Sequence, residues 1–172
     1  MGLDITAHDN IGKYLSDKWT DGLEGLIEEG GAIYLYNMGD QYSEFAGRAD
    51  AIKTGVHSVF EGTNVIKFCA GSYSGYGAWR NELAQLAGYP AFGDHNPYSR
   101  GAWGASGGPF WELINFSDCE GVIGPQTSEK LHNDFLTYLP SIDGKNAYFQ
   151  DKYLSFMEAF ELAAKGGFVK FH

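Results

Sequence analysis

Short stretches of apolar residues, several of them alternating with polar ones, predict the strands of this protein. Five stretches have the composition of strands: residues 3–8, 32–36, 51–60, 64–70 and 168–171. The dipeptide Gly62-Thr63 separates the third stretch from the fourth, at the place where a hairpin turn would join two paired strands. Residues 11–30 are acidic and interrupted by glycine, and they give no firm prediction.

Helical spacing appears in three longer segments, where apolar residues recur every three or four positions. Trp79, Leu83 and Leu86 mark the first helix, which Gly88 should end. A second helix follows Pro125 and Thr127, and its apolar positions are Leu131, Phe135 and Tyr138, with Pro140 closing it. The third helix has the longest apolar stripe: Phe149, Tyr153, Phe156, Phe160 and Ala163.

These elements predict an α+β fold in which a mainly antiparallel sheet packs against about three helices. A chain of 172 residues is typical of one domain, and we expect residues 1–172 to form it. Residues 89–109 contain glycine and proline and have little periodicity, so they predict one long loop. Loops of that length in compact domains are often functional.

Composition narrows the classes of function. The chain has 22 acidic and 12 basic residues, and residues 1–50 alone contain ten acids and three bases. Duplex nucleic acid is therefore not an expected partner, because binding to phosphates needs clustered lysine and arginine. No apolar run reaches the length of a membrane span, and no leader peptide is visible, which together predict a cytoplasmic protein. Cys69 and Cys119 are then expected to be reduced, half-buried thiols.

The segment from Gly71 to Tyr76, Gly-Ser-Tyr-Ser-Gly-Tyr, is predicted to connect a strand to a helix. A turn at a helix N-terminus presents free N–H groups that suit an anion, and Ser72, Ser74 and Arg80 would add donors. Tyr73 and Tyr76 would stack on a planar group. The alternative is a glycine-rich connection in which serine caps the helix.

A short motif, Gly104-Ala-Ser-Gly-Gly108, matches the G-x-S-x-G pattern of serine hydrolases, and Asp118 and His132 follow in the order of that family's triad. A nucleophile elbow needs a strand before the serine and a helix after it. Neither is predicted here, since Pro109 follows directly. We therefore do not expect a serine hydrolase.

Residues 115–124 contain Asn115, Asp118 and Glu120, whose oxygens suit a divalent cation or a general acid–base pair. His95 in the long loop is a further candidate for proton transfer. The simpler interpretation is a turn in which Ser117 and Asp118 hydrogen-bond to nearby backbone groups.

Several longer motifs resemble a family of uncharacterised proteins of tailed bacteriophages and prophages. They are Met1–Thr6, Phe68–Tyr76 with Trp79-Arg80, Trp111–Gly121, Ile123–Pro125 and the ending Gly166–His172. The resemblance carries no known activity and no catalytic residue. It implies a phage accessory protein that acts in the bacterial cytoplasm, and such proteins often counter host defence.

We therefore predict a protein that binds a small ligand without turnover, with an immune signal derived from a nucleotide as one possible ligand. The expected ligand-binding residues are Ser72, Tyr73, Ser74, Tyr76, Arg80, Arg100, Trp103, Trp111, Asn115 and Asp118. No cofactor, resident metal or membrane partner is expected. Two alternatives stay open: a small hydrolase that uses Asp118, Glu120 and His95, and an acidic inhibitor of a host protein or mimic of nucleic acid.

Overall fold

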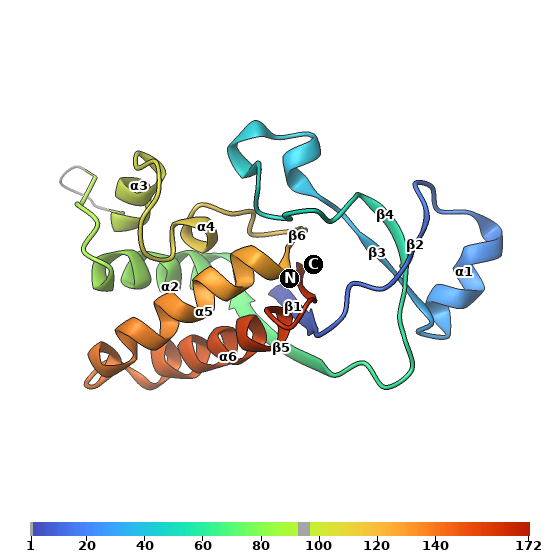
Figure 1. Ribbon diagram of the computed structural model, residues 1–172. Helices are drawn as coiled ribbons and strands as arrows, with labels where there is room; N and C mark the ends of the chain where they lie inside the picture. The colour runs from blue at the N-terminus through green and yellow to red at the C-terminus, as the bar shows by residue number, and fades with distance from the viewer. Residues whose placement is uncertain (1, 93–96) are drawn as a thin grey trace.

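The computed structural model describes residues 2–92 and 97–172, and its centre is a four-stranded antiparallel sheet, called sheet A here. The strand order is β5-β1-β7-β6, and the strands are β1 (Gly2–His8), β5 (Val65–Ser72), β6 (Gly121–Ile123) and β7 (Phe168–Phe171). Strand β1 pairs with β5 on one side and with β7 on the other. The two ends of the chain therefore lie side by side in the middle of the molecule (Figure 1).

Three long helices cover one face of sheet A. They are α2 (Tyr73–Leu86), α5 (Pro125–Tyr138) and α6 (Ala147–Ala163). Side chains alternate between the faces of a strand. Leu3, Ile5 and Ala7 of β1 accordingly point into the main core with the helices, whereas Asp4 and Thr6 point to the opposite face, which we call the back face.

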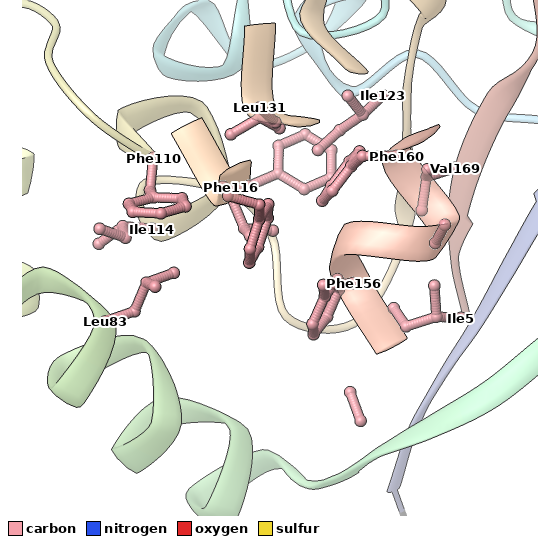
Figure 2. Packing of buried hydrophobic residues seen from close by; sticks show 14 of the residues in the cluster. Ile5, Leu83, Phe110, Ile114, Phe116, Ile123, Leu131, Phe156, Phe160 and Val169 are labelled. Carbon is pink, nitrogen blue, oxygen red and sulfur yellow. The ribbon is translucent and has the colours of Figure 1, made fainter. Parts of the chain in front are cut away.

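Aromatic rings fill the main core between sheet and helices. Phe156 of α6 stacks on Trp79 of α2 at a centroid distance of 4.8 Å and meets the edge of Phe68 of β5 at 5.0 Å. Figure 2 shows Phe156 and Phe160 of α6 next to Phe116, Ile5 and Val169. These rings, most of them buried, form one dense layer in a sequence with 27 aromatic residues.

A smaller sheet, called sheet B, packs on part of the back face. Its order is β2-β4-β3, with β2 (Tyr14–Ser16), β3 (Ala32–Leu35), β4 (Gly55–Ser58) and the adjoining helix α1 (Asp21–Glu28). Figure 1 shows these elements on the side away from the long helices. A second apolar cluster joins Leu35, Ala49 and Ile52 to Val122 and Phe168 of sheet A.

The remaining helices among the described residues are short: η1 (Met38–Asp40), η2 (Ser43–Phe45), α3 (Tyr98–Trp103), α4 (Trp111–Ile114) and η3 (Leu139–Ile142). None of the helices in residues 2–92 and 97–172 is long and apolar enough to cross a membrane.

The predicted α+β class is confirmed, as are the three long helices and the strands near residues 3–8, 32–36 and 168–171. The predicted hairpin at Gly62-Thr63 is wrong. A tight turn exists there, with Thr63 N donating to Phe60 O at 3.1 Å, but β4 belongs to sheet B and β5 to sheet A. The flanking strands diverge because β5 finds its partner in β1, which lies far away in the sequence.

Two further expectations need correction. The segment 89–109 is not one irregular loop, because α3 occupies residues 98–103. Cys69 and Cys119 are free thiols, but both are exposed rather than half-buried. Cys69 lies on the back face of β5, opposite Asp4, where alternation places it away from the helices.

A residue from a distant segment caps helix α5. Asp50 Oδ2 accepts hydrogen bonds from the backbone N–H groups of Gln126 at 2.7 Å and Thr127 at 3.1 Å. The N-cap residue of α5, whose side chain usually caps a helix, is Gly124. A Cβ at this position would lie 2.5 Å from Asp50 Oδ2. The cap therefore joins the segment that follows η2 to the helical layer.

We predict that Asp50→Ala lowers the free energy of unfolding by about 1–2 kcal/mol, because two N–H groups at the start of α5 lose their acceptor. Urea denaturation followed by circular dichroism measures the change. Asp143→Ala is the matched control, since Asp143 is exposed and makes no side-chain hydrogen bond among the described residues; its effect should stay within about 0.5 kcal/mol. Equal losses in the two variants would contradict the capping role.

Candidate functional site

A pocket of about 590 Å³ opens between the η1–η2 segment and residues 115–120, and we call it the Asp118 pocket. Its walls come from four parts of the chain: Met38, Tyr42, Glu44 and Phe45; Arg80 of α2; Trp103 of α3; and Asn115, Phe116, Ser117, Asp118, Cys119 and Glu120. Pockets that hold small molecules are typically about 300–1,000 Å³ in volume, so this one has a suitable size.

Arg80 organises the floor of the pocket. It lies two turns into α2 on the buried side, and its guanidinium stacks on the ring of Tyr76 at 4.6 Å. Nη1 donates to the carbonyl oxygens of Phe116 at 2.7 Å and Ile114 at 3.5 Å, and Nη2 contacts Asp118 Oδ2 at 3.4 Å. The guanidinium thus holds the 114–118 segment in place and has few donors left for a ligand.

The ring of Tyr76 packs against the guanidinium of Arg80, and Tyr76 does not line the pocket. Its side chain is fully buried, and its hydroxyl has no hydrogen-bond partner among the described residues. Burial raises the pKa of the Tyr76 phenol, an effect that the charge of Arg80 partly opposes. Tyr76 is therefore a neutral packing surface for the guanidinium rather than a stacking platform for a ligand.

A serine turn shapes the segment that carries the carboxylates. Ser117 Oγ accepts hydrogen bonds from the backbone N–H of Glu120 at 3.2 Å and of Cys119 at 3.4 Å. Asp118 projects from this turn with its side chain 48% exposed, and its contact is to Arg80 rather than to nearby backbone. Gly121 ends the turn at φ 124°, where a Cβ would lie 2.6 Å from Met38 and 2.9 Å from Phe116.

A second arginine ties the η1–η2 segment to the same region. Arg48 is buried, its guanidinium lies 4.0 Å from the ring centre of Trp111, and Nη2 donates to Asn115 O at 3.4 Å. Burial lowers the pKa of Arg48, and Glu112 opposes the shift. Because Arg48 uses Trp111 in this way, that tryptophan is a structural contact and does not line the pocket.

Aromatic rings form the apolar walls of the pocket. Phe45 meets Phe116 edge-on at 5.5 Å and Tyr42 at 6.3 Å. Trp103 is fixed by a hydrogen bond from Nε1 to Ile114 O at 3.3 Å, and 53% of its surface is nevertheless exposed. An exposed tryptophan held by its ring nitrogen offers its face to a planar ligand.

The charge of the pocket is negative. Glu44, Asp118 and Glu120 line it, and Arg80 is the one cation among its described lining residues. None of the ion pairs formed within residues 2–92 and 97–172 includes Glu44 or Glu120. In the same part of the chain, no three side chains of His, Cys, Asp or Glu lie close enough to hold a metal ion.

The structure brings together Arg80, Trp103, Asn115, Asp118 and Glu120 from the sequence-predicted set. The others lie elsewhere: Ser72, Tyr73, Ser74, Tyr76, Arg100 and Trp111. His95 lies outside the described residues.

The predicted anion site at residues 71–76 behaves as a helix cap. Ser72 Oγ accepts from Gly75 N at 3.1 Å and contacts Ser74 Oγ at 3.2 Å. Helix α2 starts at Tyr73, so this serine occupies the usual capping position. The turn therefore has the serine cap of the alternative interpretation, and ligand contact at residues 71–76 stays a prediction.

Four residues that line the pocket are absent from the sequence-predicted set: Met38, Tyr42, Glu44 and Phe45. The two aromatic residues stand in an irregular, polar stretch, Tyr-Ser-Glu-Phe, where no periodic element would bury them. Aromatic residues in such a stretch indicate a contact with a distant part of the chain, but nothing in the local sequence indicates which surface they contact.

Comparison of this chain with known protein families, with curated proteins and with solved structures finds no match.

We predict that Arg80→Met lowers the free energy of unfolding by about 3 kcal/mol, because the carbonyls of Ile114 and Phe116 lose a buried donor. Asp118→Asn should cost less than about 1 kcal/mol, since Asp118 is half-exposed and its contact is long. Urea denaturation measures both changes. Arg100→Met is the control, as Arg100 is exposed on α3, and a loss there as large as in Arg80→Met would refute the structural role of Arg80.

Proposed function

We propose that this protein binds a small ligand in the Asp118 pocket and does not transform it. The size of the pocket, its four aromatic walls and its fixed floor all support binding. The floor is set before any ligand arrives, because Arg80 and Arg48 hold residues 114–116 through their carbonyl oxygens. A preformed site loses little conformational entropy when it binds.

One observation supports the choice of ligand: Arg80, the one cation among the described lining residues, is already hydrogen-bonded, while three carboxylates line the same pocket. Arg80 is hydrogen-bonded to Ile114, Phe116 and Asp118. Glu44 and Glu120 have no ion-pair partner among the described residues. The ligand that fits is a molecule with a planar or apolar body and a hydrogen-bond donor or cationic group.

This chemistry does not favour a nucleotide-derived signal in the Asp118 pocket, because phosphates would meet the three carboxylates. A ligand or partner in a bacterial host, as the resemblance to phage proteins implies, stays a prediction. No observation favours the hydrolase over a binding protein, since Asp118 is held by Arg80. Docking of the acidic first third on a host protein likewise stays an alternative prediction.

Titration with two fragments that share a ring system and carry opposite charges tests the proposal. Tryptamine and indole-3-acetate share one ring system and differ in charge, so calorimetry or ligand-observed NMR compares the cation directly with the anion. We expect tryptamine to bind, and indole-3-acetate to bind at least about tenfold more weakly. Cyclic dinucleotides and ADP-ribose form a third arm, and saturable binding of either at this pocket would overturn the assigned ligand class.

We further predict that Trp103→Ala weakens tryptamine binding about tenfold, because the ligand loses its stacking surface. Trp19→Ala is a closely matched control: Trp19 is 51% exposed, against 53% for Trp103, and it does not line the pocket. If the two variants weaken tryptamine binding equally, the binding is not at the Asp118 pocket. Absence of saturable tryptamine binding to the unmodified protein would refute the proposed function itself.

A further inference from the structure

A second cavity, of about 410 Å³, lies on the back face of sheet A beside sheet B, and we call it the back-face cavity. Its polar lining consists of Thr6, His8, Lys67, Lys170 and His172. Apolar side chains complete it, among them Ile27, Ile33 and Val59. No aspartate or glutamate side chain is found among its described lining residues, although the chain has 22 acidic residues and a net charge of −10.

Strand register assembles the basic groups in this cavity. Thr6 of β1 is paired with Lys67 of β5 on one side and with Lys170 of β7 on the other. Directly paired residues point to the same face of a sheet. The two lysines therefore flank Thr6 in one row across three strands, and the hydroxyl of Thr6 contacts His172 Nε2 at 2.9 Å.

The two lysines of this row are not ion-paired with a described residue, although Asp4 lines a neighbouring hollow with Lys67 and Glu120 lines another with Lys170. None of the ion pairs formed between described residues includes Lys67 or Lys170. Lys170 is half-buried, and burial lowers the pKa of its amine. His8 adds a buried ring whose Nδ1 has no hydrogen-bond partner among the described residues. The two lysines carry the same charge on strands separated only by β1, and a half-buried charge without an ion-pair partner costs stability.

We propose that the back-face cavity binds the anionic group, carboxylate or phosphate, of a small molecule whose apolar part lies against Ile27, Ile33 and Val59. Lys67 and Lys170 supply the charge, and the imidazole of His172 and the hydroxyl of Thr6 supply hydrogen bonds. This site is independent of the Asp118 pocket and of the function proposed for that pocket, because the two cavities share no lining residue.

Calorimetry with three probes of the same chain length tests the charge requirement: hexanoate, hexyl phosphate and hexan-1-ol. We expect at least one anion to bind, and the alcohol to bind at least about tenfold more weakly. Binding of one anion alone supports the proposal and assigns the group as carboxylate or phosphate. Equal binding of the alcohol and both anions, or no binding of either anion, would overturn it.

Substitution of the lysines separates a binding role from a structural one. Lys170→Met and Lys67→Met should each weaken binding of the anion about tenfold, because each removes a charge but keeps an apolar chain. Lys165→Met is the control, since it changes net charge equally at an exposed position that does not line the cavity. An equal effect in Lys165→Met would mean that only overall charge matters, which would refute the assigned site.

Stability provides the second arm of the same experiment. Lys170→Met removes a half-buried charge that has no ion-pair partner among the described residues. If the role of Lys170 is to bind an anion, this substitution should leave the urea midpoint of the ligand-free protein unchanged or raise it. A lower midpoint together with unchanged anion binding would show a structural role instead, and would overturn the proposal.

The histidines give a direct spectroscopic readout. Burial and the charges of Lys170 and Lys67 lower the pKa of His172, and the charge of Asp4 opposes this shift. Burial and the same two lysines lower the pKa of His8, and the charge of Asp9 opposes that shift. A bound anion favours the protonated imidazole, so the pKa of His172, followed by NMR, should rise when hexyl phosphate or hexanoate is added. An unchanged His172 titration at saturating anion would place the anion elsewhere and refute the site.

Discussion

The fold depends on one constraint: the two faces of sheet A are buried to different extents. The helix-facing side carries Leu3, Ile5 and Ala7 and is closed completely by the aromatic layer of α2, α5 and α6. The back face alternates with it and carries Asp4, Thr6 and His8. A strand that is buried on one face and partly covered on the other has a sequence in which apolar and polar residues alternate, because successive side chains point in opposite directions.

Both cavities lie where this coverage ends. Sheet B buries Val122 and Phe168 of the back face but leaves the row of Thr6 and Lys170 beside an open hollow. On the other side, the η1–η2 segment approaches residues 115–120 without filling the space between them. Glu120 lines the Asp118 pocket and also a hollow of about 390 Å³ that Lys170 and His172 line, so the two regions lie on either side of one turn.

Four basic residues of this acidic protein have two different physical roles. Arg48 and Arg80 are buried, donate to backbone carbonyls and stack on aromatic rings, which is what a planar guanidinium does well. Lys67 and Lys170 make no such contacts among the described residues. The arginines therefore account for the shape of the Asp118 pocket, whereas the lysines remain available to a ligand. The two cavities consequently differ in charge, one lined by carboxylates and the other by amines.

Local spacing by itself determined the helix α6, with its stripe from Phe149 to Ala163, and the strand β1, because a period of 3.6 or 2 is a property of neighbouring residues. The sequence also indicated Arg80, Trp103 and Asp118 as candidate site residues, and the structure brings these three together at one pocket. Only the tertiary structure decided that β4 and β5 enter different sheets, that Asp50 caps α5 across 76 residues of sequence, and that Thr6 stands between Lys67 and Lys170. The reason is physical: these arrangements join residues that are far apart along the chain, and their energies come from burial and register, which no local pattern encodes.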